Sequence, residues 1–291
     1  MGDALAYVRE TIIPRIVVAS GELLGHTASA KASFEFVETR MRELRVNRVK
    51  QKITLGEVAV GVMGPGMSPD LVDVLGPLGF DAVWLEGEHG PVDFGDIADL
   101  TRAADLWGMT SIVRVNENRY GPIYRTLDLG AQGVCVPHVN TREEAQAVAD
   151  AAKFLPLGKR GIATSRQGYG VSNFLEAAND QSLAMILIED IVAVENLDEI
   201  LEVEGVDLFY VAPGDLGQSL GYMDRSHPEV LDTVDRALKT IVASGRPAGT
   251  LVTTESIARY IDLGVNFVTA AFMPWLARGA DDLLGLAGAG E

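Results

Sequence analysis

The sequence predicts a (β/α)8 barrel, the α/β fold in which eight parallel strands alternate with helices around a closed sheet. Three observations support this fold class. From residue 58 onward, short apolar runs alternate with longer amphipathic segments. Most of the runs are apolar throughout, which indicates strands that are buried on both faces. The length of 291 residues accommodates a barrel of about 250 residues with a segment to spare.

Eight segments are predicted as strands. They are residues 58–64, 81–86, 111–115, 133–139, 184–190, 208–214, 247–252 and 267–273. Helices are predicted between them, for example over 141–154 and over 228–245, where the second opens with proline and closes with glycine. An open doubly wound sheet is the alternative. Its phosphate-binding turn needs a glycine spacing that "GVMGPGMSPD" lacks, so we expect no nucleotide cofactor.

Two stretches do not follow the strand–helix alternation. Residues 1–45 precede the first strand, so we predict an N-terminal extension of unknown role before a barrel over 46–291, with a helix within 33–52. The segment between Phe154 and Leu183 is too long for a plain connection, and it contains the glycine-rich stretch "GIATSRQGYGVSN". We predict that this segment forms a loop over the functional site.

The composition restricts the classes of partner. A net charge of −17 argues against nucleic acids and anionic membranes, which both bind basic surfaces. The single cysteine, Cys135, excludes an intramolecular disulfide and a thiolate zinc site, and is consistent with the cytoplasm. Pro14 and Arg15 interrupt the most apolar N-terminal stretch, so we expect neither a signal peptide nor a membrane span. A small molecule is the expected ligand.

Charged residues gather where the predicted strands end, which is where barrels of this kind carry their chemistry. They are Glu86, Glu88 and His89 at the end of the second strand, Arg114 at the end of the third, His138 at the end of the fourth, Glu189 and Asp190 at the end of the fifth, and Asp215 at the end of the sixth. Carboxylates from different strands repel one another unless a cation lies among them. Glu189 and Asp215, with Glu86 or Glu88, therefore predict a divalent metal. Oxygen ligands favour Mg²⁺ or Mn²⁺, with Co²⁺ as a further option.

The same residues predict carbonyl chemistry. Arg114 is a permanent cation that can hold a carboxylate or a developing oxyanion, and His89 can carry a proton. A 2-oxo acid can chelate a metal through its carboxylate and keto oxygens, which favours reactions that pass through an enolate. Aldol cleavage is the simplest such reaction.

Two other mechanisms are not expected. None of the six lysines, Lys31, Lys50, Lys52, Lys153, Lys159 and Lys239, lies in or directly after a predicted strand, so no Schiff-base lysine is expected. The segments "LVTTES" and "AAFMPW" after strands seven and eight contain no glycine, whereas phosphosugar barrels bind phosphate there in a glycine-rich cradle. A phosphorylated substrate is therefore disfavoured.

Several fragments together resemble a known family. "FDAVWLEGEHGPVDF", "VRV", "LDLGAQGVCVPHVNTREEA", "LGKRGIA", "LIEDIVAVENLDEI" and "GVDLFYVAPGDLGQSLGY" are similar, in order, to the metal-dependent (class II) pyruvate aldolases of the 4-hydroxy-2-oxoheptanedioate and 2-dehydro-3-deoxyglucarate aldolase family. The resemblance runs from about Asn47 to Arg278. It implies that Glu189 and Asp215 bind the metal, that Arg114 steadies the pyruvate enolate, and that His89 is the general base.

The resemblance also assigns roles at the substrate pocket. Asp128 matches a carboxylate near the aldehyde-binding end and the subunit contact, and Gly214 lies in the turn that approaches the substrate carboxylate. Glu86 matches the partner of the histidine base. Pro137 and His138 are expected to line the substrate pocket.

The chain departs from the family pattern at four positions. Glu86 replaces a common aspartate, His138 a common methionine, Asp190 a usual threonine and Gly217 a common serine. These departures leave the two metal-binding carboxylates intact and bear on the aldehyde preference.

The resemblance further implies a homo-oligomer, a hexamer in which neighbours exchange a C-terminal helix. Residues 273–284, "MPWLARGADDLL", can supply that helix. The longer N-terminus of this chain leaves room for a different assembly.

The predicted function is metal-dependent aldol cleavage or condensation of 4-hydroxy-2-oxo acids through a metal-bound enolate, which gives pyruvate or hydroxypyruvate and an aldehyde. Oxaloacetate decarboxylation is expected as a side activity because it forms the same enolate. One alternative is a synthase that joins the enolate to another acceptor, as in citrate-forming and macrophomate-forming relatives. The other is a catalytically silent barrel that serves as an assembly or ligand-binding protein. In it the carboxylates would form structural ion pairs or helix caps, and Arg114 would neutralise Glu86.

Overall fold

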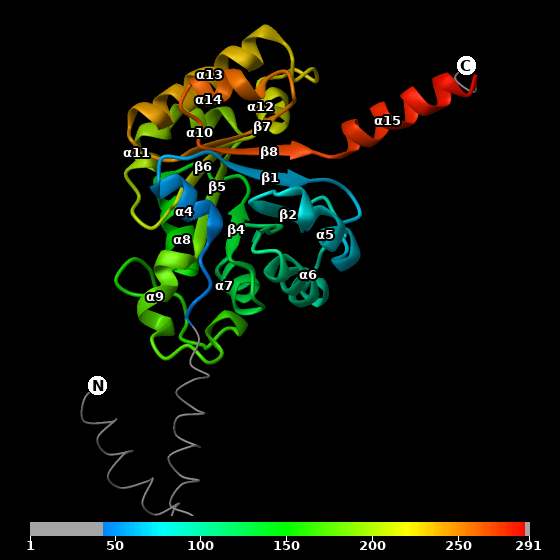
Figure 1. The fold of residues 1–291 in the computed structure, drawn as a ribbon. Helices are drawn as coiled ribbons and strands as arrows, with labels where there is room; N and C mark the ends of the chain where they lie inside the picture. Colours follow the sequence, from blue (N-terminus) through cyan, green and yellow to red (C-terminus); the bar gives the residue numbers. More distant parts are fainter. Residues whose placement is uncertain (1–42, 289–291) are drawn as a thin grey trace, which may run out of the picture. The chain divides into compact units, whose positions relative to one another are not determined.

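The computed structural model describes residues 43–288, and the larger of its two compact units comprises residues 44–169 and 173–291. In this unit, eight parallel strands form a closed barrel in sequence order, β1 to β8 (Figure 1). The barrel closes because β1 pairs with β8 in parallel, from Ala59 opposite Phe267 to Met63 opposite Ala271. The predicted (β/α)8 barrel is confirmed, and the closure excludes an open doubly wound sheet.

All eight predicted strands are present. Their bounds are β1 Ala59–Met63, β2 Ala82–Glu86, β3 Thr110–Arg114, β4 Gly133–Val136, β5 Leu183–Ile188, β6 Leu208–Val211, β7 Ala248–Val252 and β8 Phe267–Ala271. The predicted ends at residues 139, 190 and 214 are too late. The chain leaves the sheet earlier because Pro137 lacks an N–H group for a ladder hydrogen bond, and because α10 and α12 begin at Ile191 and Pro213.

Helices follow the strands and surround the barrel. Their bounds are α4 Arg48–Thr54, α5 Pro69–Leu75, α6 Phe94–Leu106, α7 Tyr120–Asp128, α8 Arg142–Ala152, α9 Phe174–Gln181, α10 Ile191–Glu195, α11 Leu197–Leu201, α12 Pro213–Ser219, α13 Pro228–Ala243, α14 Ile257–Asp262 and α15 Met273–Leu286, with short 3-10 helices at Gly76–Leu78 and Arg166–Gly168. The helices predicted over 141–154 and 228–245 are α8 and α13. A capping box between Thr141 and Glu144 begins α8, and Pro228 occupies the first turn of α13.

Side chains fill the interior of the barrel. Cys135 and Phe267 are fully buried there, and the ring centroids of Trp84 and Tyr210 lie 5.3 Å apart. The Tyr210 hydroxyl shares a hydrogen bond of 2.5 Å with the Thr269 hydroxyl, so its polar atom is satisfied. Burial raises the pKa of the Cys135 thiol well above its ordinary value, which keeps the group neutral. Cys135 is a packed core residue, and the interior offers no passage for a substrate.

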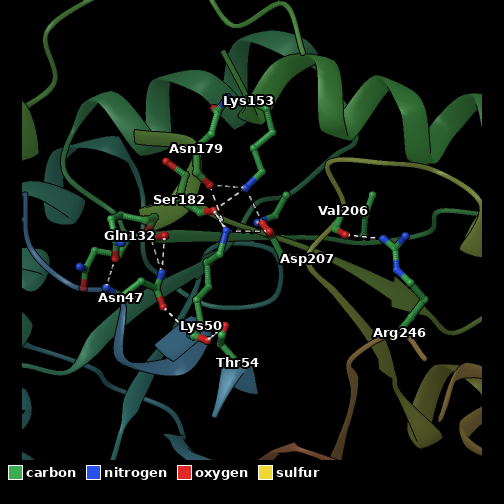
Figure 2. Close-up of polar contacts among 12 residues, drawn as sticks. Asn47, Lys50, Thr54, Gln132, Lys153, Asn179, Ser182, Val206, Asp207 and Arg246 are labelled. Carbon is green, nitrogen blue, oxygen red and sulfur yellow. Dashed lines mark hydrogen bonds and ion pairs between the residues drawn. The ribbon is translucent and has the colours of Figure 1, made fainter. Parts of the chain in front are cut away.

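A cluster of charges lies at the amino ends of the strands. This amino-end cluster consists of Lys50, Lys153, Asp207 and the carbonyl oxygens of Asn179 and Ser182 (Figure 2). Asp207 accepts from Lys50 at 2.8 Å and from Lys153 at 2.6 Å. Burial lowers the pKa of Lys153 to about 8, although Asp207 acts in the opposite direction. The cluster connects α4 and the end of α8 to the strand starts of β5 and β6.

The predicted loop over the functional site is wrong. The 3-10 helix at Arg166–Gly168 packs at the opposite end of the barrel, where Arg166 donates to Asp105 at 2.6 Å and the side-chain amide of Gln167 donates to the Gly130 carbonyl at 2.7 Å. Asp105 and Gly130 both lie just before strands begin. Glycine richness signalled a loop but could not show to which end of the barrel it belongs.

The predicted N-terminal extension lies almost entirely outside the described residues. Within them, residues 43–47 are not helical and α4 begins at Arg48, so the helix predicted over 33–52 is confirmed only from Arg48 onward. Asn47 caps this helix by accepting from the Lys50 amide, and its side chain donates to the carbonyls of Gln132 and Gln181. Over residues 43–288, no helix is long and apolar enough to cross a membrane.

The C-terminal helix α15 extends away from the barrel (Figure 1). All its residues are exposed, including Trp275, Leu276, Leu283 and Leu284. Its contacts lie near its start, where Trp275 stacks on Phe80 with ring centroids 6.0 Å apart. The helix therefore presents apolar side chains to its surroundings over most of its length.

Candidate active site

The carboxyl ends of β2 to β6 bring most of the predicted site residues to one end of the barrel. Glu86 and Arg114 are direct register partners at the ends of β2 and β3. Glu189 follows β5, and Asp215 lies in the first turn of α12, just after β6. This carboxyl-end cluster consists of Glu86, Glu88, His89, Arg114, His138, Glu189, Asp190 and Asp215.

Arg114 is the cation of this cluster, and two carboxylates hold it. Its Nε lies 2.9 and 2.8 Å from the two carboxylate oxygens of Glu86, and its Nη1 lies 2.9 Å from Glu88 Oε2. Burial by itself would raise the pKa of Glu86, but the hydrogen bonds and charge of Arg114 outweigh it and lower the pKa. Burial likewise opposes the charge of Arg114, and Glu86 outweighs it, so the pKa of Arg114 is raised. Both groups are ionised, and the guanidinium is fixed in direction.

Glu86 positions the backbone of the following loop. Its Oε1 accepts from the amides of Glu88 and His89 at 2.9 and 3.0 Å, and its Oε2 accepts from the Trp84 indole at 3.1 Å. The prediction pairs Glu86 with the base His89, and the structure places that contact at the His89 amide. The His89 imidazole is 66% exposed, with Nε2 3.8 Å from Glu88 Oε2. The ring is therefore open to a ligand.

Glu189 is the buried carboxylate of the cluster. Its side chain is 1% exposed, and Oε1 accepts from the His138 amide at 2.8 Å. Oε2 has no hydrogen-bond partner in the part of the chain that the structure describes. Burial raises the pKa of Glu189 to about 7, and the negative charge of Asp215 acts in the same direction. An unpaired buried carboxylate oxygen is unfavourable unless a ligand completes it.

Asp215 follows the next strand, and its negative charge contributes to the raised pKa of Glu189. The half-buried Asp215 side chain makes no hydrogen bond or ion pair with residues 43–288. The two carboxylates fit a divalent cation, because Glu189 has a buried oxygen without a partner and because both residues follow neighbouring strands at the same end of the barrel. Within residues 43–288, no three His, Cys, Asp or Glu side chains converge to enclose a metal. A cation held by Glu189 and Asp215 alone would keep open positions for substrate and water.

The remaining pocket residues lie beside this pair. His138 is more than half exposed, with Nδ1 3.0 Å from Asp190 Oδ2. Burial acts to lower the pKa of His138, but the Asp190 hydrogen bond and the charge of Glu189 outweigh it, so the pKa is raised. Pro137 is buried behind His138. A side chain at exposed Gly214 would meet nothing within 4 Å, so the backbone there is accessible to a ligand.

Asp128 does not join the cluster. It is the last residue of α7, shortly before β4 begins, which places it toward the amino ends of the strands. There its carboxylate forms an ion pair of 2.5 Å with Arg160. Within one chain, Asp128 is therefore a structural partner of Arg160, and a role at the aldehyde-binding end stays a prediction for an assembly of chains.

A separate cavity of about 420 Å³ lies beside the carboxyl ends of β7 and β8, and no residue of the carboxyl-end cluster lines it. Its lining includes Pro213, which precedes Asp215 by two residues, as well as Leu251, Thr253, Ala271 and Trp275. The space is sufficient for a small organic molecule, and its lining also includes the charged residues Arg225, Glu255, Arg259 and Arg278.

Residues 60–275 match the HpcH/HpaI aldolase/citrate lyase family. The chain belongs to this family. The 2-keto-3-deoxy-L-rhamnonate aldolase of Shigella sonnei is 32% identical over 235 residues, which cover 78% of the chain and 88% of that protein. The resemblance found in the sequence is confirmed, and the chain is an enzyme of a carbon–carbon lyase family.

Solved structures of HpcH/HpaI members share the fold. A family protein from Burkholderia cenocepacia superposes with a TM-score of 0.77 at 27% identity, over 83% of this chain and 99% of that one. The citrate synthase SbnG superposes with a TM-score of 0.75 at 27% identity, over 82% of this chain and 96% of that one. The structure of this chain is thus similar both to that of an aldolase/citrate lyase family protein and to that of a citrate synthase.

Two contributors to the HpcH/HpaI site were not identified from the sequence. Trp84 supports Glu86 through its indole N–H, and the Asn140 side chain donates to Asp190 at 3.1 Å. Trp84 and Glu86 lie two residues apart on β2, so strand alternation places both on the inner face. That signal was available for Trp84. Nothing in the sequence pairs Asn140 with Asp190.

Proposed function

We propose that this enzyme catalyses the reversible aldol cleavage of 4-hydroxy-2-oxo acids, which gives pyruvate or hydroxypyruvate and an aldehyde. Glu189 and Asp215 would hold a divalent cation, Mg²⁺ or Mn²⁺. The observation that carries the proposal is the buried Oε2 of Glu189, which has no hydrogen-bond partner within residues 43–288. Family membership supports the reaction class, and the 32% identical relative is named as an aldolase of a 2-keto-3-deoxy acid.

A cation held by Glu189 and Asp215 would supply Lewis acidity toward the 2-oxo group of the substrate. Arg114 stabilises the negative charge that develops on the C2 oxygen when the C3–C4 bond breaks. Glu86 and Glu88 hold the guanidinium from two directions, so it need not reorganise as the charge develops.

His89 moves the proton. Its exposed Nε2 accepts the proton of the C4 hydroxyl, the C4–O electrons form the aldehyde carbonyl, and the C3–C4 electrons move toward the C2 oxygen. In the condensation direction the same nitrogen returns the proton. Glu86 contributes by fixing the backbone of His89.

The proposed partners are a 2-oxo acid, an aldehyde and further copies of this chain. The exposed apolar side chains of α15 support an exchange of this helix between neighbours, because apolar residues on an unpacked helix gain stability when a partner covers them. Sedimentation of the full chain tests the assembly: a hexamer is expected, and a monomer would contradict it. A cytoplasmic location stays a prediction.

A synthase is the second candidate. The similarity to citrate synthase SbnG, at 27% identity over 82% of the chain, favours a reaction in which a pyruvate- or oxaloacetate-derived enolate joins another acceptor. Product analysis with oxaloacetate distinguishes the two reactions. The aldolase releases pyruvate, whereas a synthase accumulates a larger acid.

Metal removal tests the proposed function. Chelator-treated protein is assayed for pyruvate release from oxaloacetate and for condensation of pyruvate with an aldehyde panel, before and after Mg²⁺ or Mn²⁺ is restored. We expect both activities to fall at least about a hundredfold and to return with the metal. Activities that persist unchanged after chelation would contradict the proposal.

A further inference from the structure

His138 has an unusual backbone conformation. With φ of 52°, it is the one non-glycine residue at positive φ within residues 43–288. Such a conformation is unfavourable for a residue with a Cβ atom, and it persists only where neighbours hold it. Here the His138 amide donates to Glu189 Oε1 at 2.8 Å, and the ring bonds Asp190 at 3.0 Å. The backbone and the ring are both held in place.

Asp190 is committed to this ring rather than to the helix that it precedes. It occupies the N-cap position of α10, but its side chain makes no capping hydrogen bond. The Ser219 hydroxyl instead accepts from the Ile191 amide at 2.9 Å. Asp190 Oδ2 accepts from both His138 Nδ1 and the Asn140 side chain. A helix-capping role therefore does not explain Asp190, and the Asn140 contact adds a second hydrogen bond to the same oxygen.

This arrangement fixes which nitrogen of His138 faces the open end of the barrel. A carboxylate oxygen only accepts, so Nδ1 carries a proton toward Asp190. Nε2 is then directed away from Asp190, and it lies 3.8 Å from Glu88 Oε1, beyond hydrogen-bond distance. In the described part of the chain, Nε2 has no hydrogen-bond partner and belongs to a side chain that is 56% exposed. Glu88 itself contacts Arg114, so Nε2 borders the place where the reacting carbons would lie.

We propose that the His138–Asp190 pair selects the aldehyde by hydrogen-bonding a hydroxyl group on it. The inference rests on the proposed function, and its new element is the residue pair that recognises a hydroxyl next to the carbonyl of the aldehyde. A hydroxyl both donates and accepts, so it matches Nε2 in either protonation state of the ring. His138 is the contacting residue, and Asp190 is a positioning residue that acts through it. An aldehyde with hydrogen in place of the hydroxyl leaves Nε2 unpaired.

The test compares 2-hydroxypropanal with propanal, which differ only in the hydroxyl, as partners of pyruvate in the presence of Mn²⁺. The readout is the ratio of the two kcat/KM values within each protein, because effects on folding or on the shared chemistry cancel in the ratio. Wild-type protein is compared with His138→Met, which has similar length and no N–H or acceptor nitrogen. Asp190→Ala and Asp190→Asn form a matched pair, since the asparagine oxygen still accepts from Nδ1.

We expect the wild type to prefer the hydroxyaldehyde about tenfold, as one hydrogen bond allows. The preference is expected to disappear in His138→Met and Asp190→Ala and to remain in Asp190→Asn. Should His138→Met fail to fold, the two Asp190 variants decide, because only the alanine variant removes the acceptor. An active wild type whose ratio is near one, or a ratio that His138→Met or Asp190→Ala leaves unchanged, overturns this inference alone. A wild type inactive with both aldehydes and with oxaloacetate overturns the proposed function as well.

Discussion

The two ends of the barrel hold buried charge in different ways. At the amino end, Asp207 lies between Lys50 and Lys153, and both ammonium groups also donate to the carbonyls of Asn179 and Ser182. At the carboxyl end, Glu189 is as deeply buried as Lys153, but its Oε2 has no partner among residues 43–288. The first cluster is complete within the chain. The second is complete only when a ligand is added.

The comparison separates a structural cluster from a functional one. Burial shifts the pKa of Lys153 down to about 8 and that of Glu189 up to about 7, so each site disfavours its charged form. A shifted pKa alone does not identify a functional group, because structural pairs shift as well. The distinguishing observation is whether nearby groups satisfy the buried atom. Each prediction below tests this distinction.

The largest expected effect is that of Glu189→Gln. The amide keeps the size of the side chain but removes the negative charge that would bind the cation, so kcat for oxaloacetate decarboxylation and for aldol condensation should fall at least about 1,000-fold. Thermal unfolding of the metal-free variant should occur at the wild-type temperature or higher, because an uncompensated buried charge is lost. Activity within about tenfold of wild type would show that the carboxyl-end cluster is structural.

Arg114→Lys is expected to have the next largest effect. Lysine preserves the positive charge, but its ammonium group cannot contact Glu86 and Glu88 at once as the planar guanidinium does. The side chain is therefore no longer fixed opposite the negative charge that develops on the substrate. We expect kcat to fall about a hundredfold. Steady-state kinetics with oxaloacetate measures it, and an unchanged kcat would remove Arg114 from the chemistry.

At the amino end, we expect the opposite result for Asp207→Asn, which should lower stability but leave catalysis almost unchanged. It leaves two ammonium groups in a cluster without a carboxylate, and we expect the free energy of unfolding to fall by about 2 kcal/mol, a value reduced because Lys50 and Asp207 are partly exposed. Urea denaturation measures the loss. The kcat of the folded variant should remain within about threefold of wild type, and a much larger decrease would contradict the structural assignment.

The smallest expected effect is a pH dependence from Lys153. Its folded pKa of about 8 lies below the unfolded value of about 10.4, so between these pH values the unfolded chain binds more protons. The free energy of unfolding therefore contains a term that rises with pH in this range and is lost as pH falls through about 8. Compared with Lys153→Met, the wild type should show the steeper increase, by up to about 1 kcal/mol per pH unit. Parallel pH profiles of the two proteins would contradict the lowered pKa.

The sequence predicted the barrel well because buried parallel strands are apolar throughout and start sharply. Strand ends were harder to locate. The apolar or mixed residues of 137–139 and 212–214 continue the strand pattern after the backbone has left the sheet. The glycine-rich segment after Phe154 was placed at the wrong end, since composition indicates a loop but gives no direction.

The candidate site was predictable where strand order alone brings residues together. Glu86, Arg114 and Glu189 end strands or follow them directly, so their convergence follows from the barrel. The contact of Glu86 with the His89 amide depends on the conformation of a tight loop, which residue types do not specify. Asp128 lies at a helix end, outside the rule that relates strand ends to the site.

The most direct test of the central claim is Mn²⁺ binding to metal-free protein, followed by the electron paramagnetic resonance signal of free Mn²⁺. Wild type and Asp207→Asn should each bind one ion per chain, and Glu189→Gln should bind at least about a hundredfold more weakly. Binding of equal strength in wild type and Glu189→Gln, or no binding in the wild type, would contradict the claim that the unpaired carboxylate oxygen belongs to a metal site.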